Sequence, residues 1–298
     1  MRILTYTAGP EDEGRAVRTV VPRRFSLGEH AYRRLKVAGG IRIAGESVRA
    51  SRIVHEGDVI TLHLPDDESA APQSLSSAQD GLPASLIRYI DSDLIIVSKG
   101  APLPTLPSRH IASGTLREQL ISMLGAQESS FCYHPVNRLD KGTSGLMAVA
   151  RHAHAQHLLT AQLHDGFIRE YLAVTEGVPR ESEGIIDAPI ARLGPGVRRA
   201  VRQGGQRAVT HYRVERVSGG RALVRLRLET GRTHQIRVHL AHIGCPIAGD
   251  YLYGTELPEL GGRFALHSAY ISLQQPVTRE RIALHDTLPP ALCALLDA

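Results

Sequence analysis

The segment PDDESAAPQSLSSAQDGLPAS, residues 65–85, divides the chain into two parts. It consists mainly of serine, alanine, proline and acidic residues, and its apolar residues recur at neither helical nor strand spacing. A segment of this composition buries too little apolar surface to offset the entropy lost on ordering. We therefore interpret it as a flexible linker between a small domain, residues 1–64, and a large domain, residues 86–298.

The small domain carries signals for one helix and three strands. The stretch SLGE, residues 26–29, matches a capping box and predicts a helix that continues to about Val37. The glycine pair 39–40 would end that helix. IRIAGESV predicts a tight hairpin that turns at Gly45, and HEGDVITLHL predicts a final strand. These elements together describe a compact α/β unit.

Basic residues gather in this small domain. Residues 1–64 contain 11 Lys or Arg and 7 Asp or Glu, and Arg33, Arg34 and Lys36 lie on the predicted helix, with Arg42 just beyond it. The cluster indicates a surface that faces RNA phosphates, although a solvated helix face would have the same composition. The order of helix, glycine-pair strand and Gly-Asp strand resembles the S-four-type RNA-binding domain of ribosomal and RNA-modifying proteins over residues 15–64.

The large domain alternates between short strands and a few helices. Strands are predicted at IRYIDSDLIIVSKG (two strands), GLMAVA, REYLAVTEG, THYRVERV, RALVRLRLE and FALHSAYISL, and helices at TLREQLISML, HAHAQHLLTAQLH and THQIRVHLAHIG. Thr115 and Glu118 form a second capping box. Strands outnumber helices, and few strand–helix–strand units recur. The pattern favours the α+β class: a mixed, mainly antiparallel sheet with peripheral helices.

Several classes of protein are disfavoured by what the sequence lacks. No apolar run approaches the roughly 18 residues of a membrane span, and the N-terminus has no apolar core, so we expect a cytoplasmic location without membrane contact. Cys132, Cys245 and Cys293 are far apart and are expected to be buried free thiols. The chain also lacks the phosphate-binding loop of nucleotide hydrolases.

Three other interpretations of potentially reactive residues compete with the leading one. His152, His154 and His157 lie at a helix start, but their spacing does not suit a metal site, and we interpret them as solvated. His239 and His242, with His234 nearby, have no acidic ligand close in sequence, so we expect packing groups or RNA contacts. The stretch LDKGTSG is like an aspartyl-phosphate loop, but HPVNR precedes it instead of the required apolar strand.

The leading candidate is Asp140, in the stretch NRLDKGTSGL. This stretch and three later ones, REYLAV, GRTHQIRVHLAHIGCPIAGDYLYG and RFALHS, resemble the motifs of the RluA-type RNA pseudouridine synthases, and they occur in the order typical of that family. The resemblance covers about residues 87–290. It implies that the large domain is a pseudouridine synthase catalytic domain.

The resemblance also implies roles for particular residues. Asp140 corresponds to the catalytic acid, and Arg237 to the arginine that pairs with it. Tyr171 corresponds to the ring that packs on the target uracil, and Arg138 to the arginine that fills the RNA stack in place of an extruded base. A cation about 4 to 6 Å from a partly buried carboxylate favours its ionised form. We therefore expect a direct contact between Asp140 and Arg237.

Two further positions and two departures complete the comparison with the family pattern. Ile236 and Leu266 correspond to residues that line the base pocket. Asn137 stands where a histidine is usual, and Gly100 follows Lys99 where a proline is usual. Neither departure removes the Arg-Leu-Asp group, although Asn137 can alter substrate contacts.

The expected reaction is the isomerisation of uridine to pseudouridine in structured RNA. It involves no redox change and no group donor, so we expect no cofactor and no metal. The expected partner is RNA, with large-subunit ribosomal RNA preferred over transfer RNA, and the expected oligomeric state is a monomer. The main alternative is a non-catalytic RNA-binding or ribosome-assembly factor with the same fold. A glycoside hydrolase would need a second carboxylate beside the sugar.

Overall fold

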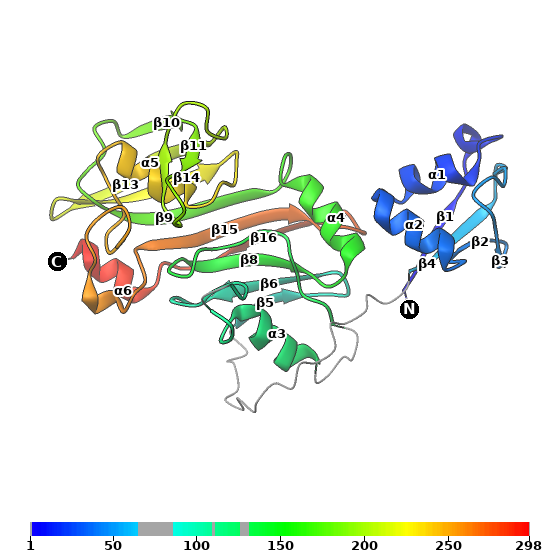
Figure 1. Cartoon of the computed structure of the whole chain (residues 1–298), viewed down its shortest axis with the longest axis horizontal. Helices are drawn as coiled ribbons and strands as arrows, with labels where there is room; N and C mark the ends of the chain where they lie inside the picture. The colour runs from blue at the N-terminus through cyan, green and yellow to red at the C-terminus, as the bar shows by residue number, and fades with distance from the viewer. Residues whose placement is uncertain (1, 65–85, 109–110, 126–130, 298) are drawn as a thin grey trace.

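The computed structural model describes residues 2–64, 86–108, 111–125 and 131–297 (Figure 1). The predicted linker, residues 65–85, lies outside these ranges. None of the helices in the described ranges is both long enough and apolar enough to cross a membrane. The described residues form a four-stranded sheet in the small predicted domain and a ten-stranded sheet in the large one.

The small sheet is antiparallel and has the strand order β1-β4-β2-β3. Its strands are β1 (Arg2–Thr7), β2 (Ile41–Ile43), β3 (Glu46–Ser47) and β4 (Val59–Leu64), and its helices are α1 (Val17–Arg24) and α2 (Glu29–Val37). Val17 and Val21 of α1, Leu35 of α2, and Ile60 and Leu62 of β4 are buried in one apolar cluster. The two helices therefore cover the sheet and complete a small core of its own.

Local signals in the small domain were confirmed in two places. Gly39 has a φ of 64°, and the Gly40 N–H donates to the Leu35 carbonyl oxygen at 2.9 Å, so the glycine pair ends α2 as predicted. Ala44 and Gly45 both have positive φ, 52° and 86°, and form the predicted two-residue hairpin turn.

The start of α2 and the elements before it were predicted incorrectly. Gly28 is the N-cap of α2 and makes no side-chain cap, and Ser26 has a φ of 48°, which places it before the helix. The predicted capping box is therefore absent at this helix. Helix α1 was missed because Pro22 lies inside it, and proline normally excludes a helix interior.

The large sheet has ten strands. The main path runs in the order β10-β13-β14-β9-β15-β8-β6-β5, with β16 paired to β15 and β7 to β8. The strands are β5 (Ile87–Ile90), β6 (Leu94–Lys99), β7 (His134–Pro135), β8 (Ser144–Ala150), β9 (Ile168–Glu176), β10 (Glu183–Asp187), β13 (Val209–Ser218), β14 (Arg221–Leu228), β15 (Leu266–Gln274) and β16 (Arg281–His285). A separate ribbon pairs β11 (Ile190–Arg192) with β12 (Arg199–Val201).

Helices lie at the edges and on the faces of this sheet (Figure 1). They are α3 (Leu116–Gly125), α4 (Ala153–Gln162), α5 (Gln235–His242) and α6 (Pro290–Cys293), with short turns at Pro258–Leu260 and Ala294–Leu296. Among the described strand pairs, β8–β15 is parallel and the others are antiparallel. The predicted α+β class with a mainly antiparallel sheet is confirmed.

The central strands are buried on both faces. In β8, Met147 and Val149 belong to the core on the side of α3 and α6, whereas Leu146 and Ala148 belong to the core on the side of α4. Successive side chains of a strand point to opposite faces. Burial on both faces therefore explains why GLMAVA is a continuous apolar run instead of an alternating one.

Other predictions for the large domain had mixed outcomes. The second capping box was confirmed: the Thr115 N–H donates to Glu118 Oε2 at 3.1 Å, and the Glu118 N–H donates to Thr115 Oγ1 at 3.4 Å. The cysteines are free, but only Cys245 is buried, and Cys132 and Cys293 are partly exposed. Strands β7, β10, β11, β12 and β16, each at most five residues long, were not predicted.

The contact between β8 and β15 depends on a glycine. Gly145 has a φ of 104°, and a Cβ at this position would lie 2.3 Å from the Ser268 carbonyl oxygen and 2.7 Å from the Ser268 nitrogen. The backbones of β8 and β15 therefore approach each other more closely here than a residue with a Cβ atom would allow. This close approach fixes the strand that leads out of the stretch containing Asp140.

We expect Gly145→Ala to destabilise the protein by about 3 kcal/mol or more, because the new methyl group would both oppose a positive φ and overlap a neighbouring backbone. Gly166→Ala is the matched control: Gly166 has a φ of 94° with no atom near its missing Cβ, so it should lose only about 1–2 kcal/mol. Urea unfolding followed by circular dichroism measures both. Equal losses would show that β8 and β15 can separate without cost.

Candidate active site

A cleft of about 830 Å³ lies on the large domain. Its walls come from the loop after β6 (residues 104–108 and 111), the turn before β8 (residues 135–143), strand β9 and the segment 228–237. These segments are far apart in sequence, and the sheet brings them together because β9 lies between β14 and β15, and β15 lies beside β8.

The six predicted residues of the large domain all line this one cleft. They are Arg138, Asp140, Tyr171, Ile236, Arg237 and Leu266. The sequence motifs that contain them are separated by long stretches of chain, so only the tertiary fold could show that they meet.

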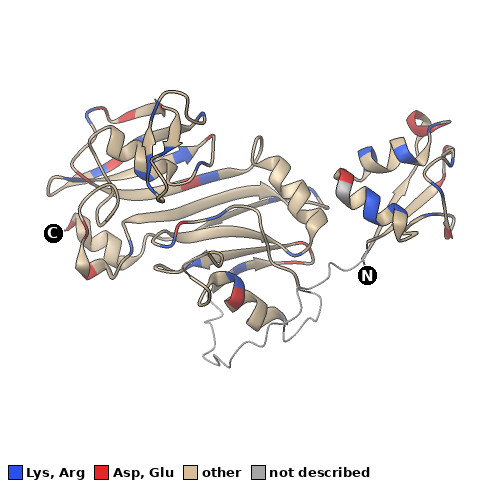
Figure 2. Cartoon of the chain, in the orientation of Figure 1, with Lys and Arg blue, Asp and Glu red and all other residues tan. Residues whose placement is uncertain are grey.

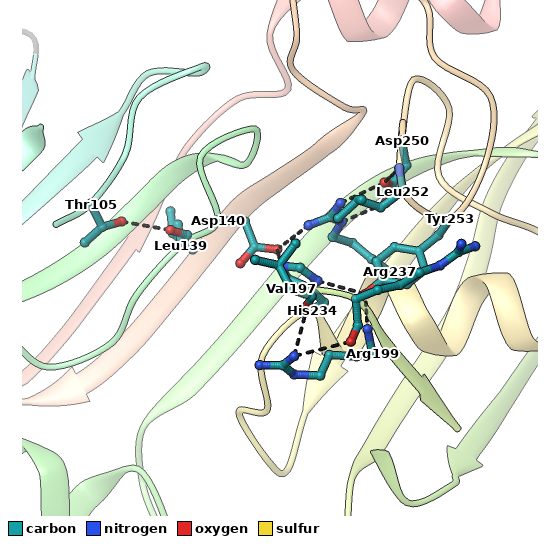
Figure 3. Close-up of polar contacts among 11 residues, drawn as sticks. Thr105, Leu139, Asp140, Val197, Arg199, His234, Arg237, Asp250, Leu252 and Tyr253 are labelled. Carbon is teal, nitrogen blue, oxygen red and sulfur yellow. Dashed lines mark hydrogen bonds and ion pairs between the residues drawn. The ribbon is translucent and has the colours of Figure 1, made fainter. Parts of the chain in front are cut away.

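Asp140 lies in contact with Arg237 at the cleft. Asp140 Oδ2 accepts a hydrogen bond from Arg237 Nη1 at 3.0 Å (Figure 3). The Asp140 side chain is 29% exposed and that of Arg237 only 2% exposed, so the carboxylate faces the cleft while the cation lies behind it. The predicted contact is confirmed. The second carboxylate oxygen, Oδ1, accepts no hydrogen bond from any residue in the described ranges and remains open to the cleft.

The turn that carries Asp140 is held by its neighbours. Asn137 Oδ1 accepts a hydrogen bond from the Ala148 N–H of β8 at 2.9 Å, and the Leu139 carbonyl oxygen accepts one from Thr105 Oγ1 at 2.8 Å. Leu139 is buried, whereas the flanking side chains at 138 and 140 face the cleft. Residues 136–140 belong to no strand, so no strand leads directly into Asp140, which removes the aspartyl-phosphate interpretation.

Lys99 supports the same turn from behind. Its side chain is buried, and Nζ donates to the carbonyl oxygens of Gly100 at 2.9 Å, Leu103 at 2.7 Å and Lys141 at 3.4 Å. Burial lowers the pKa of Lys99 to about 7, although the charge of Asp140 acts in the opposite direction. The contact with Lys141 joins the end of β6 to the residue that follows Asp140.

Arg237 is fixed by a second carboxylate that the sequence interpretation left without a role. Arg237 Nε donates to Asp250 Oδ2 at 2.7 Å and Nη2 donates to Asp250 Oδ1 at 2.8 Å, and Asp250 is fully buried. The guanidinium carbon also lies 4.2 Å from the centre of the Phe264 ring. Burial alone would lower the pKa of Arg237, but the hydrogen bonds with Asp250 and the charge of Asp140 raise it overall.

A signal for Asp250 was present in the motif GDYLYG. A buried arginine needs a paired charge, because an unpaired one costs several kcal/mol. If Arg237 is expected to be buried, it needs a carboxylate partner. Asp250, thirteen residues later in the family motif GDYLYG, is a candidate for that partner. The bidentate geometry leaves one amino group of Arg237, Nη1, for Asp140.

His234 completes the group around Asp140. His234 Nδ1 lies 2.8 Å from Tyr253 Oη, and Nε2 lies 3.9 Å from Asp140 Oδ2. Tyr253 Oη also accepts the Arg199 N–H at 2.9 Å, so Tyr253 links His234 to the backbone of Arg199 (Figure 3). Burial lowers the pKa of His234, opposed by Asp140 and reinforced by Arg237.

The other histidines singled out in the sequence are not metal ligands within the described part of the chain. His239 is buried, with Nδ1 2.9 Å from Thr210 Oγ1 and Nε2 2.9 Å from the Ala188 carbonyl oxygen, so it is a packing group, while His242 is exposed. His154 is also buried, which corrects the expectation of a fully solvated histidine group there. Within the described ranges, no group of three or more potential ligands could hold a metal ion.

Tyr171, Ile236 and Leu266 form an apolar part of the cleft. Each is about 5% exposed or less, and all three belong to the main core cluster. Burial raises the pKa of Tyr171, so its hydroxyl stays protonated. The three side chains together give a surface that suits a flat uncharged ring.

The predicted basic patch of the small domain is not part of this cleft. Arg33, Lys36 and Arg42 are exposed and Arg34 is partly exposed. Figure 2 shows Lys and Arg positions, in blue, along both helices of the small domain. Arg33 Nη2 lies 3.1 Å from Glu29 Oε1, and both of these side chains are mostly exposed, so the pair contributes little stability. The patch and the cleft are therefore two separate groups of residues.

Comparison with known proteins identifies relatives that cover most of the chain. Residues 93–242 match the family model described as RNA pseudouridylate synthase. The RNA pseudouridine synthase YjbO of Bacillus subtilis is 36% identical over 265 residues, which covers 88% of this chain and 92% of YjbO. The ribosomal large subunit pseudouridine synthase D of Xanthomonas campestris pv. campestris is 36% identical over 282 residues, which covers 88% and 81% of the two chains.

A solved structure agrees with these relatives. The human RNA pseudouridylate synthase domain containing 4 superposes with a TM-score of 0.58 at 25% identity, covering 71% of this chain and 91% of the human one.

We expect Asp250→Asn to destabilise the protein by about 3–5 kcal/mol, because it removes the charge that compensates buried Arg237. The matched control is Asp140→Asn, which should cost about 1 kcal/mol or less, since Asp140 is partly exposed and Arg237 keeps Asp250. Chemical unfolding at neutral pH measures both. A larger loss for Asp140→Asn would mean that Asp140, and not Asp250, holds Arg237 in place.

Proposed function

The chain belongs to the RNA pseudouridylate synthase family, and from this premise we propose that it modifies a uridine of large-subunit ribosomal RNA, with Asp140 as the catalytic residue. The reaction of the family is the isomerisation of uridine to pseudouridine. It breaks the bond between C1′ and N1, turns the uracil, and joins C1′ to C5, while C5 loses its proton and N1 gains one.

The contact between Asp140 and Arg237 is the observation on which this proposal depends. The carboxylate lies at the cleft with Oδ2 held 3.0 Å from Arg237 Nη1, and Oδ1 is open to a substrate. Asp250 holds Arg237 in turn, so the carboxylate is oriented by a rigid group and not by a mobile side chain. A preorganised carboxylate can attack C1′ or remove a sugar proton, and both routes help uracil to leave.

The apolar part of the cleft is proposed as the uracil site. Tyr171 would pack on the base, and Ile236 and Leu266 would enclose it. A uridine within folded RNA has to leave its stack, which costs a few kcal/mol. Arg138 is exposed at the rim of the cleft, and it would occupy the gap left in the stack and so offset part of this cost.

The small domain is proposed as a second RNA-binding unit of the S-four type. Its exposed Arg33, Lys36 and Arg42 support this, because exposed arginine and lysine bind phosphates without regard to sequence. Relatives named for the large ribosomal subunit support ribosomal RNA as the substrate, ahead of transfer RNA. A monomer in the cytoplasm, where ribosomal RNA is found, is the corresponding proposal for its state and location.

We expect Asp140→Asn to lower catalysis by at least about 10²–10⁴-fold, because the amide cannot act as a nucleophile or as a base. The measurement is the release of tritium from an unmodified large-subunit ribosomal RNA transcript labelled at uracil C5. Tyr171→Phe keeps the ring and should retain measurable release. If the wild type binds this RNA but releases no tritium, the protein is instead a non-catalytic RNA-binding factor.

For the small domain, we expect the triple change Arg33→Gln, Arg34→Gln and Lys36→Gln to weaken RNA binding. The dependence of log Kd on log salt should become shallower by about 0.7–0.9 for each RNA phosphate that the variant no longer neutralises. Arg180→Gln is the control, because Arg180 is 97% exposed on the large domain and lies outside the cleft. A triple variant with the wild-type salt dependence would exclude this patch as a phosphate-binding surface.

A further inference from the structure

Arg169 of β9 is a buried cation without a partner in the described part of the chain. It is 6% exposed, and its Nε has no hydrogen-bond acceptor. Within the described ranges no residue forms a hydrogen bond or an ion pair with its side chain, and its one ring contact places Cζ 5.6 Å from the centre of Phe167. Arg237, at a similar depth, has two carboxylates.

Neighbouring acidic residues are already paired elsewhere. Glu170, the next residue, accepts from Arg225 Nη1 at 3.2 Å. Glu229, which also lines the cleft, lies 2.7 Å from His211 Nε2 and forms an ion pair with Arg207. These two acidic residues are thus paired with other side chains, and neither provides a counter-charge for Arg169.

A buried charge without a partner is unfavourable, and proteins seldom retain one without a counter-charge. Because Arg169 lines the cleft, its counter-charge can come from a ligand in the cleft. The unpaired charge of Arg169 would then lower the stability of the free protein. A negatively charged ligand in the cleft would remove this cost when it binds.

The position of Arg169 relative to Tyr171 limits what that ligand can be. The two residues are two apart on β9, so their side chains leave the same face of the strand roughly 6–7 Å from each other. Gly231 passes over the guanidinium, and a Cβ at residue 231 would lie 3.2 Å from Arg169 Nη1. The guanidinium is thus enclosed between the strand and the segment 228–237, one step along the cleft from the proposed uracil site.

We infer that Arg169 binds a backbone phosphate of the RNA, beside the nucleotide whose uracil packs on Tyr171. This inference rests on the proposed function. Every nucleotide brings a phosphate within reach of its base, and the planar guanidinium donates to a phosphate through two parallel hydrogen bonds. A uracil carbonyl is uncharged and would leave the buried cation uncompensated. Arg169 thus positions the nucleotide by its backbone, independently of the base sequence.

The first test compares the stability of the free protein. Arg169→Met keeps most of the packing volume and removes the unpaired charge, so its melting temperature should equal or exceed that of the wild type. An arginine with a purely structural role would instead lower the melting temperature when replaced. A clear decrease in Arg169→Met would overturn the inference.

The second test measures the salt dependence of catalysis on the tritium-labelled large-subunit ribosomal RNA transcript. The slope of log kcat/KM against log KCl should become shallower by about 0.7–0.9 in Arg169→Gln, because the variant neutralises one RNA phosphate fewer than the wild type. Arg169→Lys keeps the charge and should keep the wild-type slope. Arg180→Gln, outside the cleft, is the control and should also keep it.

The outcomes separate the phosphate assignment from the proposed function. If the wild type releases tritium and Arg169→Gln lowers kcat/KM with an unchanged slope, Arg169 contacts an uncharged part of the substrate, and the phosphate assignment fails alone. If the wild type releases no tritium, the proposed function and the phosphate assignment fail together.

Discussion

One buried guanidinium orders the cleft of this protein. Arg237 uses Nε and Nη2 for Asp250 and Nη1 for Asp140, and its guanidinium lies against the ring of Phe264. Each of the three nitrogens of the planar group therefore has a carboxylate partner, and rotation of the side chain would break several contacts at once. Asp140 needs no other partner among the described residues to stay in place, so one of its oxygens is left for the substrate.

The sheet makes this arrangement possible. Helix α5 supplies Arg237, the segment before β15 supplies Phe264 and Asp250, and the turn before β8 supplies Asp140. The Gly145 contact sets β8 and β15 at backbone distance, so the turn and the arginine meet in a fixed relation. The two departures from the family pattern also contribute contacts around the Asp140 turn. Asn137 accepts a hydrogen bond from the backbone of β8, and the Gly100 carbonyl oxygen accepts one from Lys99.

Much of this could be predicted from the sequence, and the remainder depended on tertiary context. Motifs in the family order located Asp140, Tyr171 and Arg237, because each of these residues lies in a short stretch whose sequence pattern can be recognised by itself. Asp250 stood in the motif GDYLYG but received no role, because its pairing becomes apparent only once Arg237 is known to be buried. Arg169 was missed because its burial and its lack of a partner are not visible in a linear pattern. Similarly, Pro22 concealed α1 because propensity is a weak guide where packing against a sheet can override it.

The central strand pairing also has a consequence for how the protein is made. Asp140 and Arg237 are 97 residues apart, and β8 is completed by β15, whose last residue is 274. Contacts between such distant segments form late, after a long loop has been closed. A nascent chain that has exposed the Asp140 turn but not β15 has no assembled reaction centre, so the protein cannot begin to alter RNA until β15 has emerged from the ribosome.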